Sequence, residues 1–206
     1  GKPALAGMPA TFEGKGEGQG AQTLVITLKD ALLGLKVELR YSIFEDSDAI
    51  IRSVAAINEG EKKLYLEKVL SACLDMDNEN FDLITLHGCW ARERHMTTRK
   101  VTEGKHIVSS LRGETSHEVQ PFMALTTAGT SQREGEVYAM NLVYSGNFLA
   151  ETELDYQESV RMSLGLHPDG FEWLLEPGER FETPEAVLVY SDGGLGKMSR
   201  TFHGLY

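Results

Sequence analysis

One short stretch of the chain combines residue types that bind neutral polar ligands. Trp90 is followed by Arg92 and Arg94 at alternating positions. An indole ring stacks on the apolar face of a sugar, and a guanidinium group donates paired hydrogen bonds to hydroxyl or carboxylate oxygens. If the segment is extended, this spacing could place the indole ring and the two guanidinium groups on one face. The alternative is a half-buried tryptophan beside Arg–Glu surface pairs, and the residue types alone favour that alternative.

Motifs of a self-contained catalytic or metal site are absent from the sequence. It contains no Cys-x-x-Cys, no His-Glu-x-x-His, no Gly-x-Ser-x-Gly and no Walker-type phosphate loop. The acidic run that begins at Asp75 resembles the start of a calcium loop, but its sixth position is Asn80 instead of glycine and its twelfth is Leu86 instead of glutamate. A solvated turn is the favoured interpretation. We therefore predict no catalytic residue, no metal site and no cofactor in this chain.

The six histidines show no metal-ligand spacing. They are His87, His95, His106, His117, His167 and His203. An enzyme that epimerises sugars on a β-sandwich could still bring a distant histidine and glutamate together, although a structural role is favoured for each histidine. Ser116 and His117 are neighbours on an expected strand or at its end. Because neighbouring strand residues face opposite ways, a nucleophile–base contact between them is not expected.

Glycine occupies every second position from Gly14 to Gly20. A dinucleotide-binding loop needs Gly-x-Gly-x-x-Gly between a strand and a helix, whereas a strand-like pattern follows this segment. We interpret it as a flexible loop within a lead-in that comprises residues 1–22.

The composition restricts the partners of the chain. Its 206 residues carry 20 Lys+Arg against 31 Asp+Glu, a formal net charge of −11. Nucleic acids and anionic membranes attract clustered cations, and no apolar run approaches the roughly 20 residues that span a bilayer. The two cysteines, Cys73 and Cys89, exclude a disulfide framework and fit a reducing cytoplasm. We predict a cytoplasmic protein without nucleic-acid or membrane partners.

The two ends of the sequence suggest a piece of a larger protein. It opens at Gly1 without methionine and stops at Tyr206 beside apolar residues, so we expect further domains around it.

The elements that position these residues follow a two-residue period. Apolar and polar side chains alternate in residues 23–28 and 35–43 around a turn at 30–34, which predicts a hairpin with an apolar face turned inward. Further strand-like segments are residues 49–57, 64–76, 83–87, 106–110, 122–126, 136–144, 148–154, 159–164, 171–175 and 186–190. Many short strands separated by turns predict an all-β antiparallel sandwich over residues 23–191.

The C-terminal residues change to a helical period. Leu195, Met198, Phe202 and Leu205 share one face of a predicted amphipathic helix within residues 192–206. We interpret this helix as a connector toward a following domain.

Several blocks of the sequence occur together in a characteristic order. They are Arg52-Ser, Gly88-Cys-Trp90-Ala-Arg92-Glu-Arg94, Arg112-Gly-Glu-Thr-Ser116-His117, Pro121-Phe122, Gly135-Glu-Val-Tyr, Tyr144-Ser-Gly-Asn147-Phe148, Phe171-Glu-Trp173-Leu-Leu-Glu-Pro177-Gly178-Glu and Phe181-Glu-Thr-Pro184-Glu. In these blocks the chain resembles the N-terminal domain of bacterial family 36 glycoside hydrolases, the melibiase- and raffinase-type α-galactosidases. The resemblance extends over essentially the whole chain.

The resemblance implies a fold and an activity for the parent protein. The fold is a β-supersandwich related in architecture to galactose mutarotase, followed by a catalytic (β/α)8 barrel and a C-terminal β domain. The activity is retaining hydrolysis of terminal α-galactose in melibiose, raffinose and stachyose, by an Asp nucleophile and an Asp acid/base that lie in the barrel beyond Tyr206. No aspartate of this chain matches those motifs. The family also has a segment before the position of Gly1, with strands of the same sandwich and a loop that reaches a neighbouring subunit of a tetramer.

The resemblance also assigns a role to the tryptophan segment. Trp90, with Arg92 and Arg94 behind it, matches the family strip at the mouth of the barrel, where Trp90 forms part of the sugar-binding wall. We therefore expect a non-catalytic domain that packs on the barrel, helps subunit association and lends Trp90 to the site, with Arg92 and Arg94 as further substrate-binding residues. Two alternatives remain: a free-standing carbohydrate-binding module, and a mutarotase-like sandwich enzyme that uses a histidine and a glutamate.

Overall fold

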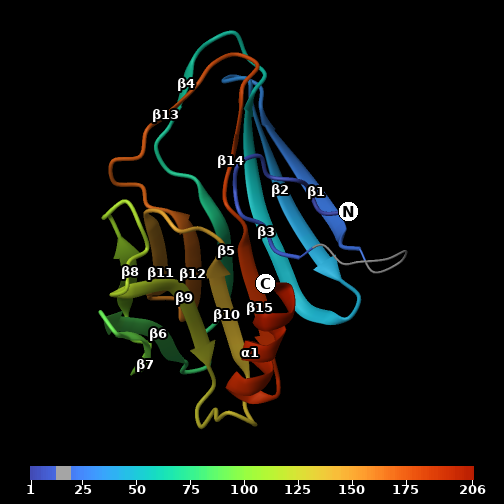
Figure 1. The fold of residues 1–206 in the computed structure, drawn as a ribbon. Helices are drawn as coiled ribbons and strands as arrows, with labels where there is room; N and C mark the ends of the chain where they lie inside the picture. The colour runs from blue at the N-terminus through green and yellow to red at the C-terminus, as the bar shows by residue number, and fades with distance from the viewer. Residues whose placement is uncertain (13–19) are drawn as a thin grey trace.

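The protein is an antiparallel β-sandwich with a helix on its outer face (Figure 1). The structure, a computed structural model, describes residues 1–12 and 20–206. The strands are β1 (Gln22–Asp30), β2 (Leu35–Phe44), β3 (Ser47–Asn58), β4 (Leu64–Leu66), β5 (Leu70–Asp77), β6 (Asp82–Cys89), β7 (Arg92–Lys100), β8 (Gly104–Ser110), β9 (Val119–Thr126), β10 (Val137–Leu142), β11 (Phe148–Leu154), β12 (Ser159–Leu166), β13 (Trp173–Leu175), β14 (Arg180–Glu182) and β15 (Ala186–Ser191); the helix is α1 (Gly194–Leu205). The all-β class, the antiparallel pairing and the C-terminal helix predicted from the sequence are confirmed.

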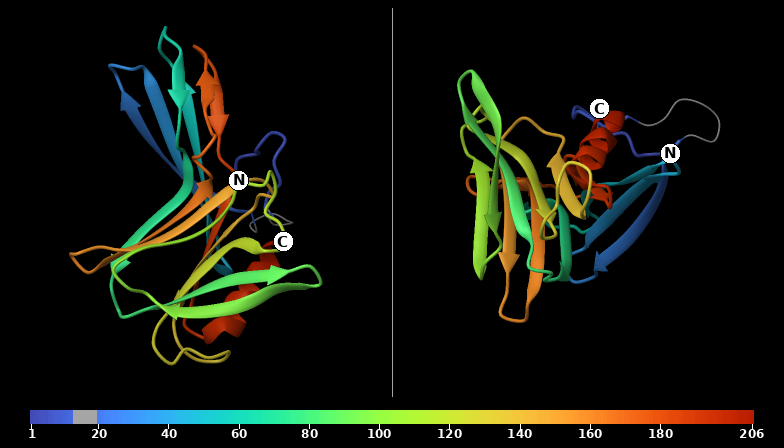
Figure 2. Two further views of the ribbon diagram at one scale, coloured as in Figure 1. Left: turned by 90° about the vertical axis from the view of Figure 1, so that its left-hand side faces the viewer. Right: turned by 90° about the horizontal axis from the view of Figure 1, so that it is seen from below.

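Two sheets of unequal width form the sandwich. Within the described residues, the large sheet has nine strands in the order β1-β2-β3-β15-β10-β9-β6-β7, with β14 added to β3, and the second sheet has four in the order β5-β12-β11-β8. The second sheet packs across the sandwich through β5 on β3, β12 on β10, and β11 and β8 on β9. Strands β1 and β2 therefore extend beyond it, as the two views of Figure 2 also show.

Three clusters of buried side chains hold the layers together. The largest lies between the two sheets and includes Phe81, Met123, Met140, Phe148 and Met162. The second lies under α1 and includes Ile51, Phe122, Val187, Met198 and Phe202. The third, around Leu175 and Phe181, closes the end near the small β4–β13 ribbon. Burial of these apolar side chains is the main favourable contribution to folding.

Helix α1 starts on a loop that supplies its missing hydrogen-bond acceptors. Gly194, at φ +70°, donates to the carbonyl of Gly135, and Leu195 donates to the carbonyl of Ser131. A Cβ at position 194 would lie 2.4 Å from the oxygen of Ser131, so only glycine fits there. The stripe of Leu195, Met198, Phe202 and Leu205 is buried against the large sheet, as the helical spacing predicts.

The boundaries of several predicted strands differ from the structure. The segment 64–76 is two strands, β4 and β5, and neither β7 nor β14 is among the strands predicted from the sequence. Nearly all side chains of β7 are polar and exposed, so no alternation marks it. Ser116 and His117 lie in a turn before β9 instead of on a strand. The Gly-rich loop predicted at residues 14–20 lies almost entirely outside the described residues.

The prediction that the apolar face of the first hairpin is buried is wrong. Leu24 is 61 % exposed, and Ile26 and Leu28 are exposed as well. The hairpin itself forms as expected, since the Asp30 carboxylate accepts hydrogen bonds from the backbone of Leu32 and Leu33. Its apolar face is open because the second sheet reaches only as far as β3.

A buried ion pair anchors the N-terminal residues to the sheet. The Glu185 carboxylate pairs with the Lys2 ammonium and accepts hydrogen bonds from the backbone nitrogen of Thr11 at 2.7 Å and from its hydroxyl at 2.9 Å. The Lys2 and Glu185 side chains are 5 % and 2 % exposed. Nearby, the backbone nitrogen of Phe12 donates to the carbonyl of Leu205 at 2.8 Å, so the segment also touches the end of α1.

One helix is present in the described residues, and it is neither long nor apolar enough to cross a membrane.

Replacement of Lys2 by methionine is expected to lower the free energy of unfolding by about 3 kcal/mol, because it leaves a buried carboxylate without its cation. Chemical denaturation measures this loss. The matched control is Lys29→Met, which removes an exposed partner of Glu59 and is expected to cost less than about 1 kcal/mol. Equal and small losses for both variants would contradict the anchoring role of Lys2.

Candidate functional site

Trp90 lies at the tip of the β6–β7 hairpin. Strand β6 ends at Cys89 and β7 begins at Arg92, and these two residues pair across the turn. Ala91 takes a left-handed conformation at φ +61°, and its backbone nitrogen donates to the Glu93 carboxylate at 2.9 Å. The Trp90 side chain is 83 % exposed. The ring is therefore not the half-buried tryptophan of the alternative interpretation, and it presents an apolar surface to solvent.

The base of this hairpin is tightly packed. Gly88 donates its backbone N–H to the carbonyl of Glu118 at 2.9 Å, where the register between β6 and β9 shifts. A Cβ at position 88 would lie 2.4 Å from the oxygen of Arg92, so a larger residue would push the two strands of the hairpin apart. Gly88 thus determines how closely β7 approaches β6 below Trp90.

Arg92 and Arg94 follow Trp90 on β7, and both are exposed. Neither guanidinium forms an ion pair within the described residues, so the Arg–Glu surface pairs of the alternative interpretation are not present. Arg94 has a φ of +62°, a left-handed conformation that interrupts the alternation of the strand. The regular alternation that would place Trp90, Arg92 and Arg94 on one face is therefore interrupted at Arg94. Trp90 and Arg92 lie at the tip, whereas Arg94 lines a groove beside it.

The groove has a volume of about 540 Å³ and lies between the β6–β7 hairpin and α1. Aromatic and apolar side chains of Met96, Phe122 and Tyr206 contribute to its wall. The Tyr206 hydroxyl donates to the Asn141 side-chain oxygen at 2.8 Å, and the Tyr206 ring stacks on Phe202 with centroids 6.2 Å apart. The groove combines apolar surface with amide and guanidinium groups, a mixture that suits a polar partner with apolar faces.

Sequence reasoning missed the other polar residues of the groove. They are Thr115, Gln120, Gln132, Asn141, Tyr144, Ser199, His203 and Tyr206. These residues come from β9, β10, α1 and the loops between strands, and their proximity depends on the order of strands in the large sheet. No local spacing in the sequence reports that order.

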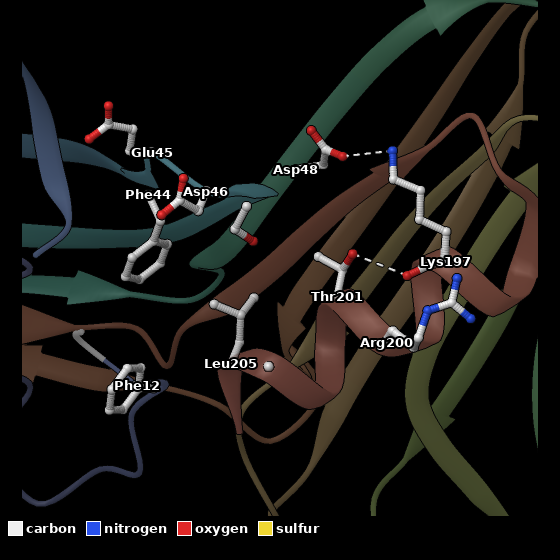
Figure 3. A pocket seen from close by; sticks show the side chains of 11 residues that line it. Phe12, Phe44, Glu45, Asp46, Asp48, Lys197, Arg200, Thr201 and Leu205 are labelled. Atoms are coloured by element: carbon white, nitrogen blue, oxygen red, sulfur yellow. Dashed lines mark hydrogen bonds and ion pairs between the residues drawn. The ribbon is translucent and has the colours of Figure 1, made fainter. Parts of the chain in front are cut away.

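A second cavity, of about 550 Å³, lies between the β2–β3 turn, Phe12 and the last turns of α1 (Figure 3). The Lys197 ammonium pairs with Asp48 at 2.9 Å and with Asp192 at 2.8 Å. These carboxylates raise the pKa of Lys197, and Lys197 in turn lowers the pKa of Asp192. Glu45 points away from Lys197 in Figure 3. The cavity thus combines apolar and charged side chains, and an ion-pair network between the start of β3 and α1 borders it.

Three buried or half-buried carboxylates among the described residues are held by cations. Glu185 pairs with Lys2, as described above, and Glu38 and Glu182 both pair with Arg40 and Arg180. A retaining or inverting pair of carboxyl groups needs one member free to exchange a proton with the substrate, whereas each of these carboxylates is engaged by a cation. They are structural in character.

The histidines do not meet carboxylates in the described part of the chain. The His87 ring is 2.8 Å from the Thr85 hydroxyl, and His167 Nδ1 accepts from the backbone nitrogen of Asp169 at 3.1 Å. Among the described residues, no group of three or more His, Cys, Asp or Glu side chains is arranged to hold a metal ion. The hydrogen bonds of His87 and His167 serve local turns and strand ends.

Comparison with known proteins finds a matching family model and similar α-galactosidases. The model of the glycosyl hydrolase family 36 N-terminal domain matches residues 1–176. The chain is 46 % identical over 206 residues to α-galactosidase AgaA of Geobacillus stearothermophilus and 42 % identical over 205 residues to α-galactosidase Mel36A of Lactobacillus acidophilus. Both alignments cover 100 % of this chain but 28 % of the relative. A crystal structure of an AgaA variant in complex with stachyose superposes with a TM-score of 0.95 at 45 % identity, over 99 % of this chain and 28 % of the other.

Replacement of Trp90 by alanine is expected to leave the free energy of unfolding within about 0.5 kcal/mol of the parent chain, because the exposed ring packs against no core. The control is Trp173→Ala. The Trp173 ring is 47 % exposed and lies 5.2 Å from the Phe181 ring, so its loss is expected to cost about 1–2 kcal/mol. Urea denaturation of both variants measures the difference. A large loss for Trp90→Ala would show that the ring supports the fold instead of facing a ligand.

Proposed function

The chain belongs to the family of glycosyl hydrolase family 36 N-terminal domains, and we propose that it is the non-catalytic N-terminal part of an α-galactosidase. The observation that carries this proposal is the 46 % identity over the whole chain to an α-galactosidase of which it spans 28 %. The rest of such a protein supplies the catalytic barrel, and this chain supplies a support for that barrel.

The proposed reaction of the whole protein is hydrolysis of terminal α-galactosyl residues with retention of configuration. Melibiose, raffinose and stachyose are the proposed substrates, in keeping with the stachyose complex of the Geobacillus relative. Retention requires two carboxyl groups about 5–5.5 Å apart, one as nucleophile and one as acid/base. We assign both to aspartates of the barrel beyond Tyr206. The ion-paired state of Glu38, Glu182 and Glu185 supports a division of labour in which this chain contributes no catalytic carboxylate.

Trp90 is the proposed contribution of this domain to the substrate site. Its exposed ring, at the tip of a hairpin with a tightly packed base, suits stacking on a sugar at the mouth of the barrel. Arg92 is close enough in the chain to donate hydrogen bonds to sugar hydroxyls there. Arg94, which lines the neighbouring groove, is better suited to contact the barrel itself.

The proposed domain organisation follows from the layers of the fold. Residues 23–191 form the sandwich, 1–22 form a lead-in, and 192–206 connect to the barrel through α1. The uncovered face of β1 and β2 supports the proposal that the first part of the sandwich precedes this chain in the whole protein. We further propose a cytoplasmic homotetramer, as the family resemblance implies.

A free-standing carbohydrate-binding module is the second candidate, because an exposed tryptophan at a hairpin tip is also suited to such a module. In that case the isolated chain binds galactosides without the barrel. The non-catalytic domain instead needs the barrel to complete its site.

The first test compares the isolated chain with the longer protein on a nitrophenyl α-galactoside. The longer protein is expected to release nitrophenol and the isolated chain is not. Turnover that follows the isolated chain through rigorous purification would overturn the non-catalytic role. Polarimetry of α-to-β galactose interconversion in the same samples tests the mutarotase-like alternative.

The second test concerns Trp90. In the longer protein, Trp90→Ala is expected to raise KM for raffinose about 10-fold with a smaller effect on kcat, since an exposed stacking contact contributes about 1–2 kcal/mol to binding. Isothermal titration of the isolated chain with raffinose is expected to show no binding. Binding by the isolated chain that Trp90→Ala abolishes would favour the carbohydrate-binding module.

A further inference from the structure

The turn that carries Trp90 differs from the ordinary two-residue loop of a β-hairpin. Cys89 pairs with Arg92, so Trp90 and Ala91 are the two loop residues. The favoured loops of this length have a positive φ at the first residue or at both. Here Ala91 has a φ of +61°, and Trp90 is not among the described residues with a positive φ. The loop therefore has the φ signs of a type II turn, in which glycine normally occupies the second position.

A left-handed alanine at this position is strained and needs support from its surroundings. The strands below the loop are well determined. The register between β6 and β7 shifts between His87 and Cys89. Gly88 lets the two strands approach closely, and Arg94 has a second left-handed conformation at φ +62°. These features determine where the loop begins and ends, but they do not determine how its central peptide is oriented.

Glu93 holds that central peptide. The backbone nitrogen of Ala91 donates to Glu93 Oε1 at 2.9 Å. This N–H belongs to the peptide unit that joins Trp90 to Ala91. Because a peptide unit is planar, the direction of its N–H determines ψ of Trp90 and φ of Ala91 together. Type I and type II turns differ mainly in the rotation of this unit, so the carboxylate selects one of the two conformations.

The carboxylate of Glu93 forms this bond although two arginines flank it in the sequence. Neither Arg92 nor Arg94 forms an ion pair within the described residues. Neighbouring side chains of a strand point to opposite faces, which separates the Arg92 guanidinium from the Glu93 carboxylate. A hydrogen bond to a charged acceptor is also stronger than one to a neutral acceptor. Glu93 therefore serves the turn, and it does not neutralise the charge of Arg92.

The orientation of the Trp90 ring depends on this turn. The side chain is 83 % exposed, so packing against the core does not fix it. The allowed rotamers of a side chain depend on its own φ and ψ, and ψ of Trp90 is set by the peptide that Glu93 holds. A ring that is already oriented loses less conformational entropy when a ligand stacks on it. The Glu93 acceptor thus affects binding to Trp90 from outside the stacking contact.

Taking the proposed stacking role of Trp90 as its premise, we propose that Glu93 is a positioning residue for sugar binding at Trp90. Its carboxylate keeps the peptide between Trp90 and Ala91 in the type II orientation and so presets the indole ring for the apolar face of a pyranose. Glu93 acts through Trp90 and makes no contact with the sugar itself. Its role depends on an acceptor oxygen and not on its negative charge.

The first test compares Glu93→Ala with Glu93→Gln in the longer protein. Glu93→Ala is expected to raise KM for raffinose about 3- to 5-fold without a change in kcat, since the turn loses its hydrogen bond. The amide oxygen of Glu93→Gln still accepts from Ala91, so KM is expected to stay within about twofold of the parent. The matched control is Glu103→Ala, which removes an exposed glutamate beyond the other end of β7 and is expected to leave KM unchanged. Equal increases for Glu93→Ala and Glu93→Gln would contradict the acceptor role.

A double variant tests whether Glu93 acts through Trp90. In Trp90→Ala the ring that Glu93 positions is gone, so the addition of Glu93→Ala is expected to cause no further rise in KM. Effects that multiply in the double variant would overturn the proposal, because they would show that Glu93 contacts the substrate or supports another residue. The Tm of Glu93→Ala is expected to stay within about 2 °C of the parent. A larger fall in Tm would assign Glu93 to the fold instead.

Fluorescence tests the positioning without any sugar. The chain has two tryptophans, so Trp173→Phe leaves Trp90 as its only indole. In that background Glu93→Ala is expected to lower the residual anisotropy of the indole on the nanosecond timescale, whereas Glu93→Gln is not. An anisotropy that Glu93→Ala leaves unchanged would refute the positioning role. Failure of the proposed function would appear separately: if Trp90→Ala leaves KM for raffinose unchanged, Trp90 does not stack on the substrate, whatever Glu93 does to the ring.

Discussion

Strand β3 hydrogen-bonds with β2 along one edge and with β14 and β15 along the other, so it joins the first hairpin to the middle of the large sheet. Its two faces serve different layers. Ala49 and Ile51 face the cluster under α1, and Ala56 packs against Leu175 and Phe181 at the opposite end of the strand. The small side chains of Ala49 and Ala56 let other elements pack closely on both faces of the strand. Strand β3 therefore lies between the first hairpin and the remaining strands of the large sheet.

The unequal width of the two sheets explains where the exposed features lie. At one end of the large sheet, β1 and β2 extend past the second sheet with an apolar face. At the other end, β6 and β7 form a hairpin whose outer strand is polar on both faces and carries Trp90 at its turn. An apolar face needs a cover, whereas a polar hairpin is stable in water and can hold an aromatic side chain away from the core. The two ends are thus suited to different partners.

Alternation in the sequence predicts the long strands well because it reports which side chains share a face. It predicts neither β7, whose residues are polar throughout, nor the three-residue β14. It also cannot report whether a face is covered, and Leu24 is exposed for that reason. Residue type leaves Trp90 between two interpretations and the family resemblance selects it as a candidate. The groove beside it depends on Asn141 and Tyr206, which lie 65 residues apart and meet only through the sheet order and the helix.

The anchor between Lys2 and Glu185 has a consequence for the order of events during synthesis. The two residues are 183 positions apart, so Lys2 leaves the ribosome long before its acceptor exists. Contacts of such separation close the largest loops and therefore form late. Strands β1, β2 and β3 can pair with one another early, because short turns connect them. Lys2 therefore stays solvated until Glu185 and β15 have been synthesised. Its docking on Glu185 is expected to be among the last steps of folding.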